Sequence, residues 1–458
     1  MTNFRRFAPV AALALAGLAA GCKDFLTGGE LTRDPNRPTV ATSGNLLIGA
    51  QANLWAIIGG DPARVTGIWS QEFAGGLQQY ANYENYGLSE QTTNGFHQSL
   101  YAGGGLVDIR RIQDKSRAAG DTLFLGIGQV MEGFLMGTGA DLFGNLVYSE
   151  ALKGKANPAL DKQIDVYNQV QNVLAEGIKN LEAPNTGGTN VGPGSSDLVY
   201  GGDADSWIEL AHTLRARFYM HTAEVDPTAY QKALDEAKQG ISSHAGDYVG
   251  VFSGNAQEQN LYYQFNGPAG RQGYLLPNPS FLKLLETRSD PRRSEYFNAA
   301  GTKLSATRLA PNFSQPFVTY NENLLIWAEA AYRTNDPATA LIKLNQAKTD
   351  AGVPTVSGLT GPALLAEILL EKYIADFQLG VEAWKDYERT CTPNLEPTNA
   401  SLGVPARMFY DAGERQTNTN IPQPGQGINA RRPALSTGFV DPANATSDAD
   451  GTACKAQR

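Results

Sequence analysis

The sequence predicts a mainly α-helical protein, and three observations carry this prediction. Apolar residues recur at helical spacing in successive segments between Ser43 and Arg389. Several of these segments follow one another closely, as the two helices of an antiparallel pair do. No stretch shows the sustained apolar and polar alternation of half-buried strands, and the rest of the chain is rich in Gly, Pro and aromatic residues.

In the first half, Ser43 can cap a helix with Leu47, Ala50 and Leu54 on its apolar face. A second helix begins near Pro62 and ends near Trp69. Gly103–Gly105 interrupts the next helical pattern, since each glycine in a helix interior costs ~1 kcal/mol. Further helices are expected over 96–117 with that interruption, 122–140, 165–181, 207–218 and 228–239.

The second half predicts more helices, over 279–287, 321–333, 337–351 and the long periodic segment 364–389. The spacing of 321–333 and 337–351 matches one tetratricopeptide unit, with small or apolar residues where paired helices press together. Those residues are Leu324, Ala328, Ala340, Leu344 and Ala347.

Two segments combine aromatic and amide side chains without helical periodicity, and we expect both to be loops. They lie near 75–95 and 243–278. An exposed ring stacks on the apolar face of a sugar, and nearby amides bind its hydroxyl groups. The predicted ligand-binding residues are Trp69, Tyr80, Tyr83, Tyr86, Tyr262, Tyr263, Phe265 and Tyr274. The alternative is that these rings pack the loops onto the body of the protein.

The N-terminus has the pattern of a secretory signal peptide, expected to comprise residues 1–21. Arg5 and Arg6 precede an apolar run that is too short for a membrane span. The run ends in small residues before Cys22, which resembles a bacterial lipobox, although Leu18 stands one place earlier than usual. We expect Cys22 to be acylated and residues 22–42 to form the anchor and linker. The alternative is an ordinary signal peptide with an incidental cysteine.

The composition excludes nucleic acid as a partner. The chain has a formal charge of −9, and removing Arg5 and Arg6 with the signal peptide leaves −11. Such a chain does not attract a phosphate backbone. Only 18% of the residues are charged, and the 19 tyrosines suit a surface that binds hydroxyl groups.

If Cys22 is acylated, Cys391 and Cys454 remain as a pair. Outside the cytoplasm they can form a disulfide that ties the irregular tail to a helix end. The alternative is two free, buried thiols.

No catalytic, metal or cofactor motif is present. The histidines His97, His212, His221 and His244 lack metal-ligand spacing, and the chain has neither a nucleophile elbow nor a phosphate-binding loop. The segment 447–451 resembles half of a calcium loop but lacks its closing Glu. Paired carboxylates, as in glycosidases, are not excluded by the sequence.

Motifs spread along the whole chain resemble the SusD/RagB family of nutrient-binding outer-membrane lipoproteins, in its SusD-like branch. Those motifs are Cys22-Lys-Asp-Phe-Leu26, Asp141-Leu-Phe-Gly144 with its continuation to Ala151, Trp207 to Arg217, Ser289 to Arg292, Asn323 to Ala330, Glu371 to Ala375 and Gly380 to Arg389. The segment Val404 to Tyr410 is similar to the tail of that branch, except that Asp411 stands where Pro is usual. Most of these residues have structural roles: helix stops, buried Trp and Arg–carboxylate ties.

The resemblance implies a single SusD-like domain over 43–458, with four tetratricopeptide-like helix pairs and a loop-rich lobe that binds ligand. Its loop-rich insertions would lie near 75–95, 185–203, 243–278 and 390–458. It further implies a surface-exposed, lipid-anchored protein that is not an enzyme. Such a protein binds oligosaccharide or peptide and delivers it to a TonB-dependent SusC-like barrel. Two alternatives stay open: a periplasm-facing helical-repeat scaffold and a surface glycoside hydrolase.

Overall fold

The computed structural model describes residues 41–187, 191–223, 225–268, 270–396, 398–399 and 404–422. The predicted signal peptide, Cys22 and Cys454 lie outside these residues. Cys391, at the end of its helix, is disulfide-bonded. Its predicted pairing with Cys454 stays a prediction.

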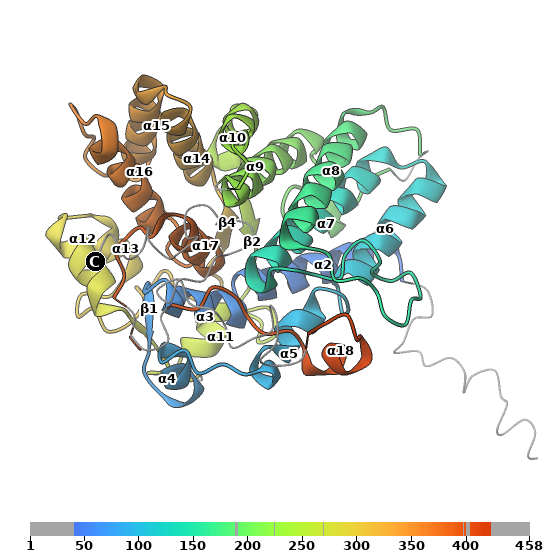
Figure 1. Cartoon of the computed structure of the whole chain (residues 1–458), viewed down its shortest axis with the longest axis horizontal. Helices are drawn as coiled ribbons and strands as arrows, with labels where there is room; N and C mark the ends of the chain where they lie inside the picture. The colour runs from blue at the N-terminus through green and yellow to red at the C-terminus, as the bar shows by residue number, and fades with distance from the viewer. Residues whose placement is uncertain are drawn as a thin grey trace, which may run out of the picture.

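The first half of the protein is helical, as predicted (Figure 1). Its helices are α2 (Ser43–Ile58), α3 (Asp61–Trp69), α4 (Gln78–Glu84), α5 (Glu90–Ser99), α6 (Leu106–Ala119), α7 (Thr122–Phe143), α8 (Gln163–Glu182), α9 (Ala204–Thr222) and α10 (Ala229–Ala237). Thr42, rather than Ser43, caps α2 by accepting a hydrogen bond from the amide of Asn45. The glycines at 103–105 separate α5 from α6, because Gly103 and Gly104 have positive φ angles of 58° and 91°.

The second half contains α11 (Leu261–Asn266), α12 (Pro279–Thr287), α13 (Arg292–Tyr296), α14 (Tyr320–Arg333), α15 (Pro337–Asp350), α16 (Gly361–Ala375), α17 (Gly380–Thr390) and α18 (Ala412–Thr417). The predicted pair 321–333 and 337–351 is confirmed as α14 and α15. The five residues expected between them are all buried. They share a second apolar cluster with side chains of α9, α10 and α16.

The segment 364–389 is not one long helix, as its periodicity suggested. It divides into α16 and α17 at Asp376–Leu379, where Gln378 has a φ of 71°. The side-chain carbonyl of Gln378 accepts a hydrogen bond from Arg308 at 2.9 Å. After the break, every residue of α17 from Gly380 to Arg389 is buried, whereas α16 is only partly buried, and a periodicity count does not reveal this change.

Among the described residues, four short strands join segments that are distant in the sequence. Strand β1 (Phe73–Gly75) pairs antiparallel with β3 (Leu275–Pro277), and β2 (Tyr248–Gly250) pairs with β4 (Gln315–Val318). The first pair joins the two aromatic segments singled out from the sequence. Their pairing is long-range and was not predicted.

Helix α7 runs through the core. It is long and apolar enough to cross a membrane, but 89% of its apolar window is buried inside the protein, which marks it as a core helix. Close approach to α8 requires glycine, because a Cβ at Gly126 would lie 2.9 Å from the carbonyl oxygen of Gly177. Figure 1 shows α8, α10, α14 and α15 along one edge of the molecule, and α4, α5, α11 and α18 along the opposite edge.

Candidate ligand-binding site

The structure brings the two predicted aromatic segments together. The ring of Tyr80 on α4 lies 4.6 Å from the ring of Phe265 on α11, and Phe265 lies 6.1 Å from Tyr274. The guanidinium of Arg64 lies 4.4 Å over the ring of Phe265 and donates a hydrogen bond to the Tyr80 hydroxyl at 2.9 Å. The two segments therefore lie side by side, as predicted. However, their rings pack against each other and leave no space for a ligand between them.

Six of the eight predicted ligand-binding residues are buried: Trp69, Tyr80, Tyr83, Tyr86, Tyr262 and Phe265. Their polar atoms serve the fold. The Tyr80 hydroxyl donates to Asp61, and the Tyr86 hydroxyl accepts from the amide of Thr398 at 3.0 Å. Burial raises the pKa of Tyr83 to about 12. These rings present no open face to a sugar, because both faces are covered by protein. These six residues therefore follow the alternative interpretation, in which the rings pack the loops onto the body of the protein.

Tyr263 and Tyr274 are the two predicted residues that remain partly exposed. Around them, Gln78 and Gln79 of α4, Gln264 of α11, and Arg271 and Gln272 in the segment after α11 are exposed. We name these seven residues the α4–α11 surface. It combines two tyrosine rings with amide groups, which is the chemistry that the sequence suggested for a shallow glycan-binding surface.

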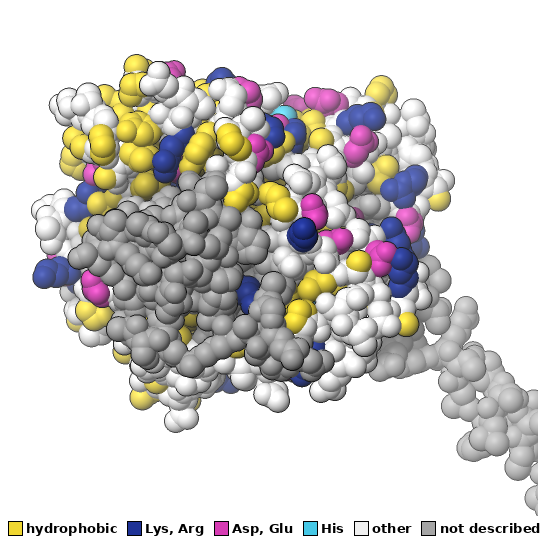
Figure 2. Space-filling model, viewed as in Figure 1, with side chains coloured by type: hydrophobic (Ala, Val, Ile, Leu, Met, Phe, Trp, Pro, Cys, Tyr) yellow, Lys and Arg dark blue, Asp and Glu magenta, His cyan; other side chains and the backbone are white. Residues whose placement is uncertain are grey.

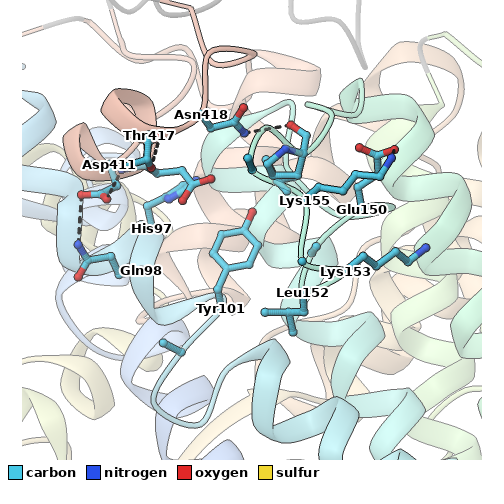
Figure 3. A pocket seen from close by; sticks show the side chains of 17 residues that line it. His97, Gln98, Tyr101, Glu150, Leu152, Lys153, Lys155, Asp411, Thr417 and Asn418 are labelled. Carbon is cyan, nitrogen blue, oxygen red and sulfur yellow. Dashed lines mark hydrogen bonds and ion pairs between the residues drawn. The ribbon is translucent and has the colours of Figure 1, made fainter.

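A separate pocket of about 480 Å³ lies between α5, α18 and the segment 147–158 (Figure 3). Its walls include Tyr101, Val147 and Ala151 on the apolar side. Gln98, Asp411 and Asn418 lie on the polar side. The carboxylate of Asp411 accepts hydrogen bonds from Gln98 and from the amide of Glu414, which fixes the first turn of α18. The volume lies within the range of ~300–1,000 Å³ that is usual for small-ligand pockets.

His97 forms part of the inner wall of this pocket. Burial lowers its pKa to about 4, despite the nearby carboxylate of Asp411, so the imidazole is neutral at physiological pH. The rings of Phe143 and Tyr410 cross it edge to face at 5.0 and 5.8 Å and fix its orientation. A neutral imidazole can both donate and accept a hydrogen bond.

The core also contains a network of buried charges. Glu382 contacts His221 and Lys372 at 3.3 and 3.0 Å, and Lys372 contacts Asp386 at 2.6 Å. His221, Glu382 and Asp386 lie close enough together to bind a metal ion. However, Lys372 already bridges the two carboxylates. The network is therefore better suited to holding helices together than to binding a metal ion. This agrees with the structural roles that the sequence motifs suggested.

The sequence pointed to neither the pocket nor its residues. For His97 the sequence shows only the lack of metal-ligand spacing, and for Asp411 only the replacement of a proline. The pocket is built from segments near positions 100, 150 and 415, and no local pattern links them. Leu152, at the mouth of the pocket, is 52% exposed and has a φ of 64°, and neither property can be read from the sequence.

The family model described as "Starch-binding associating with outer membrane", a SusD-like model, matches residues 35–309, which is more than half of the chain. The chain belongs to this SusD-like family. The resemblance stated from the motifs is thereby confirmed. The comparison with curated proteins found no match to the chain.

Solved structures of SusD-like proteins share the fold. A chitin-binding SusD homologue from Flavobacterium johnsoniae superposes with a TM-score of 0.70 at 20% identity, covering 85% of this chain and 98% of its own. A SusD/RagB family protein from Bacteroides thetaiotaomicron has a TM-score of 0.68 at 20% identity, covering 87% and 99%. A SusD homologue from Bacteroides uniformis has a TM-score of 0.68 at 21% identity, covering 85% and 98%. The predicted mainly α, SusD-like fold is confirmed.

Proposed function

We propose that this protein is a lipid-anchored glycan-binding protein of the outer membrane that faces the cell exterior and delivers its ligand to a TonB-dependent SusC-like transporter. The observation that carries the proposal is the SusD-like family match over residues 35–309. The proposed activity is binding without catalysis.

A neutral glycan is the favoured ligand for two reasons. The family is described as starch-binding, and one solved relative is described as chitin-binding. In addition, the net charge of −11 expected after signal-peptide removal disfavours acidic polymers by long-range repulsion. A peptide is the second ligand class that the resemblance suggests.

We place the main ligand contact on the α4–α11 surface. Tyr263 and Tyr274 supply the exposed ring area, while the glutamines supply donors and acceptors for hydroxyl groups. The buried rings of Tyr80 and Phe265 have a different part in this proposal. They hold α4 against α11 and so keep the exposed residues in place.

The proposed transporter contact lies on the side of the helix pairs. Figure 2 shows hydrophobic side chains gathered over α15 and α16, at the upper left of the view. Ile342 on α15 is 57% exposed, which is a high value for a large apolar side chain. A contiguous apolar patch of this kind suits a protein partner.

The test is calorimetry of the purified protein against a panel of neutral glycans, acidic glycans and peptides. Tyr263→Ala and Tyr274→Ala are compared with Tyr332→Ala, which removes a partly exposed ring from α14 on the helix-pair side. We expect a neutral glycan to bind and each of the first two variants to weaken it at least fivefold, about 1 kcal/mol, without loss of folding. Tyr332→Ala should bind like the wild type.

Three results would contradict the proposal. Binding of a glycan with equal affinity by all variants would remove the site from the α4–α11 surface. Turnover of a polysaccharide by the pure protein would favour the hydrolase alternative. Resistance of the protein to protease on intact cells would favour the periplasm-facing scaffold.

A further inference from the structure

The pocket between α5, α18 and the segment 147–158 carries a more specific inference than the open α4–α11 surface. It is a concave site of about 480 Å³, which is too large for a single ion. Figure 1 places α5 and α18 on the same edge of the molecule as α4 and α11, away from the helix pairs. A ligand in this pocket would therefore leave the proposed transporter side free.

One wall of the pocket is apolar and extends from its interior to its mouth. Val147, Ala151 and the ring of Tyr101 form its inner part. Leu152 is 52% exposed and has a left-handed backbone with a φ of 64°. This conformation is unfavourable for a bulky residue, and such strain is concentrated at ligand-binding positions. The strained turn holds an isobutyl group at the pocket mouth, where the C–H face of a sugar ring could lie against it.

The pocket lining also keeps unused hydrogen-bonding capacity. In the part of the chain that the structure describes, the side chains of His97, Lys153 and Glu414 make no hydrogen bond, and the buried hydroxyl of Tyr101 has no hydrogen-bond partner. His97 is only 2% exposed, so its neutral imidazole is held rigidly at the inner wall. Buried polar groups are normally hydrogen-bonded, and an unpaired one beside a cavity indicates a position for a ligand polar group.

The charges around the pocket nearly balance. Its lining holds the carboxylates of Glu150, Asp411 and Glu414 and the amines of Lys153 and Lys155. Glu150 and Lys155 form an ion pair with each other, and Asp411 is occupied by Gln98 and the α18 amide. Asp411 keeps its charge because both of its donors are neutral, so the three carboxylates and two amines leave the lining with a single net negative charge and no strong field. Such a pocket does not select an ion, and it suits a neutral molecule with many hydroxyl groups.

From these observations we propose that the pocket is a second binding site that takes a short neutral saccharide, such as the end of a glycan chain. The proposal rests on the proposed function, since it places one end of the same class of ligand. Apolar contact comes from Leu152 and Val147. Hydroxyl groups of the sugar bind His97, Glu414 and Lys153.

The test uses three disaccharides, maltose, cellobiose and N,N′-diacetylchitobiose, titrated at millimolar concentration into the full mature chain. Ala102→Trp places an indole at the pocket mouth, where Ala102 is exposed, so the substitution leaves the core intact. Ala118→Trp on the exposed side of α6 is the matched control. At least one disaccharide should bind, Ala102→Trp should weaken it at least tenfold, and Ala118→Trp should not change it.

The variant Tyr263→Ala tests the pocket proposal and the proposed function separately. It should weaken binding of a long glycan while leaving disaccharide affinity within twofold of the wild type. If no disaccharide binds, or if Ala102→Trp leaves disaccharide affinity unchanged, the pocket proposal is overturned. Retention of a long glycan by the wild type and its loss in Tyr263→Ala would still support the proposed function in that case.

Discussion

Single residues of the buried charge network hold several helices at once. Arg389 on α17 donates to both carboxylate oxygens of Glu329 on α14, at 2.6 and 2.8 Å, and to Asp386 at 2.8 Å. The side chains of Arg389 and Glu329 are both 0% exposed. In such a pair, loss of one partner costs more than the pair itself contributes, because the remaining charge is buried without compensation.

Arg389→Met should therefore destabilise the protein by ~3–5 kcal/mol. The double variant Arg389→Met with Glu329→Met should recover a large part of that loss, since it also removes the buried Glu329 carboxylate, which otherwise keeps only the contact with Arg333 at 3.5 Å. The measurement is the midpoint of urea unfolding. Arg117→Met is the control, because its partner Asp114 is 76% exposed and the pair lies in solvent. Equal effects of Arg389→Met and Arg117→Met would contradict the argument.

His221 gives the network a predictable pH dependence. Burial lowers the pKa of this imidazole, but the carboxylates of Asp141 and Glu382 outweigh burial and raise the pKa to about 9. The unfolded value is about 6.5. A raised folded pKa means that the stabilisation is complete below pH ~6.5 and is lost as the pH rises through 9. His221→Asn should thus be less stable than the wild type at pH 6, and this difference should shrink towards pH 9. A difference that stays constant over this range would refute a charged His221.

At the scale of elements, the packing of α7 against α8 depends on glycine. A Cβ at Gly126 would lie 2.6 Å from Leu181 and 2.9 Å from the backbone oxygen of Gly177. The main chain of α8 cannot move without disturbing the core. Gly126→Ala should therefore cost ~1–3 kcal/mol through overpacking, although alanine favours the helix.

The matched control is Gly95→Ala on α5, where nothing lies within 4 Å of the added Cβ. This variant should be as stable as the wild type, or more stable by up to ~1 kcal/mol, since alanine favours a helix. Thermal unfolding followed by circular dichroism compares the two. A stable Gly126→Ala protein would mean that α7 and α8 can separate more easily than the structure indicates.

The helices also show which elements can be predicted from the sequence. Helices with a strong apolar stripe, such as α8 and α14, were predicted close to their observed bounds, because the stripe is local information. The helices α4 and α11 were expected to be loops. They are only 7 and 6 residues long and are stabilised by contacts between distant segments, such as Tyr80 with Phe265.

The burial of the aromatic residues could not be predicted for a related reason. Tyr80 is buried by Arg64, Asp61 and Phe265, and the last of these lies far away in the sequence. Composition identifies aromatic rings beside amides, but it does not show whether a ring faces solvent or another ring. The pocket was missed because its walls meet only after α18 packs on α5.

At the scale of the whole molecule, the proposed function requires that the ligand and the transporter bind to opposite sides of the protein. Ligand binding is assigned to the edge with α4, α5, α11 and α18, and the transporter contact to the helix pairs on the other edge. A protein used in this way must be held at the membrane but remain free to contact its partner. The predicted acylation of Cys22 and the linker of residues 22–42 would provide that attachment, and all of this segment except residues 41 and 42 lies outside the described residues.

Cys22→Ser should release the protein from the outer membrane, because the lipid is attached through the cysteine sulfur and several acyl chains give stable anchoring. Cell fractionation with immunoblotting measures the membrane-bound share, and mass spectrometry of the wild type should find an acylated Cys22 at the N-terminus. Cys454→Ser is the control, because it makes the same chemical change in the tail and should leave the protein in the membrane fraction. An unmodified N-terminus at another position, or a membrane-bound Cys22→Ser protein, would show that the lipobox resemblance misleads.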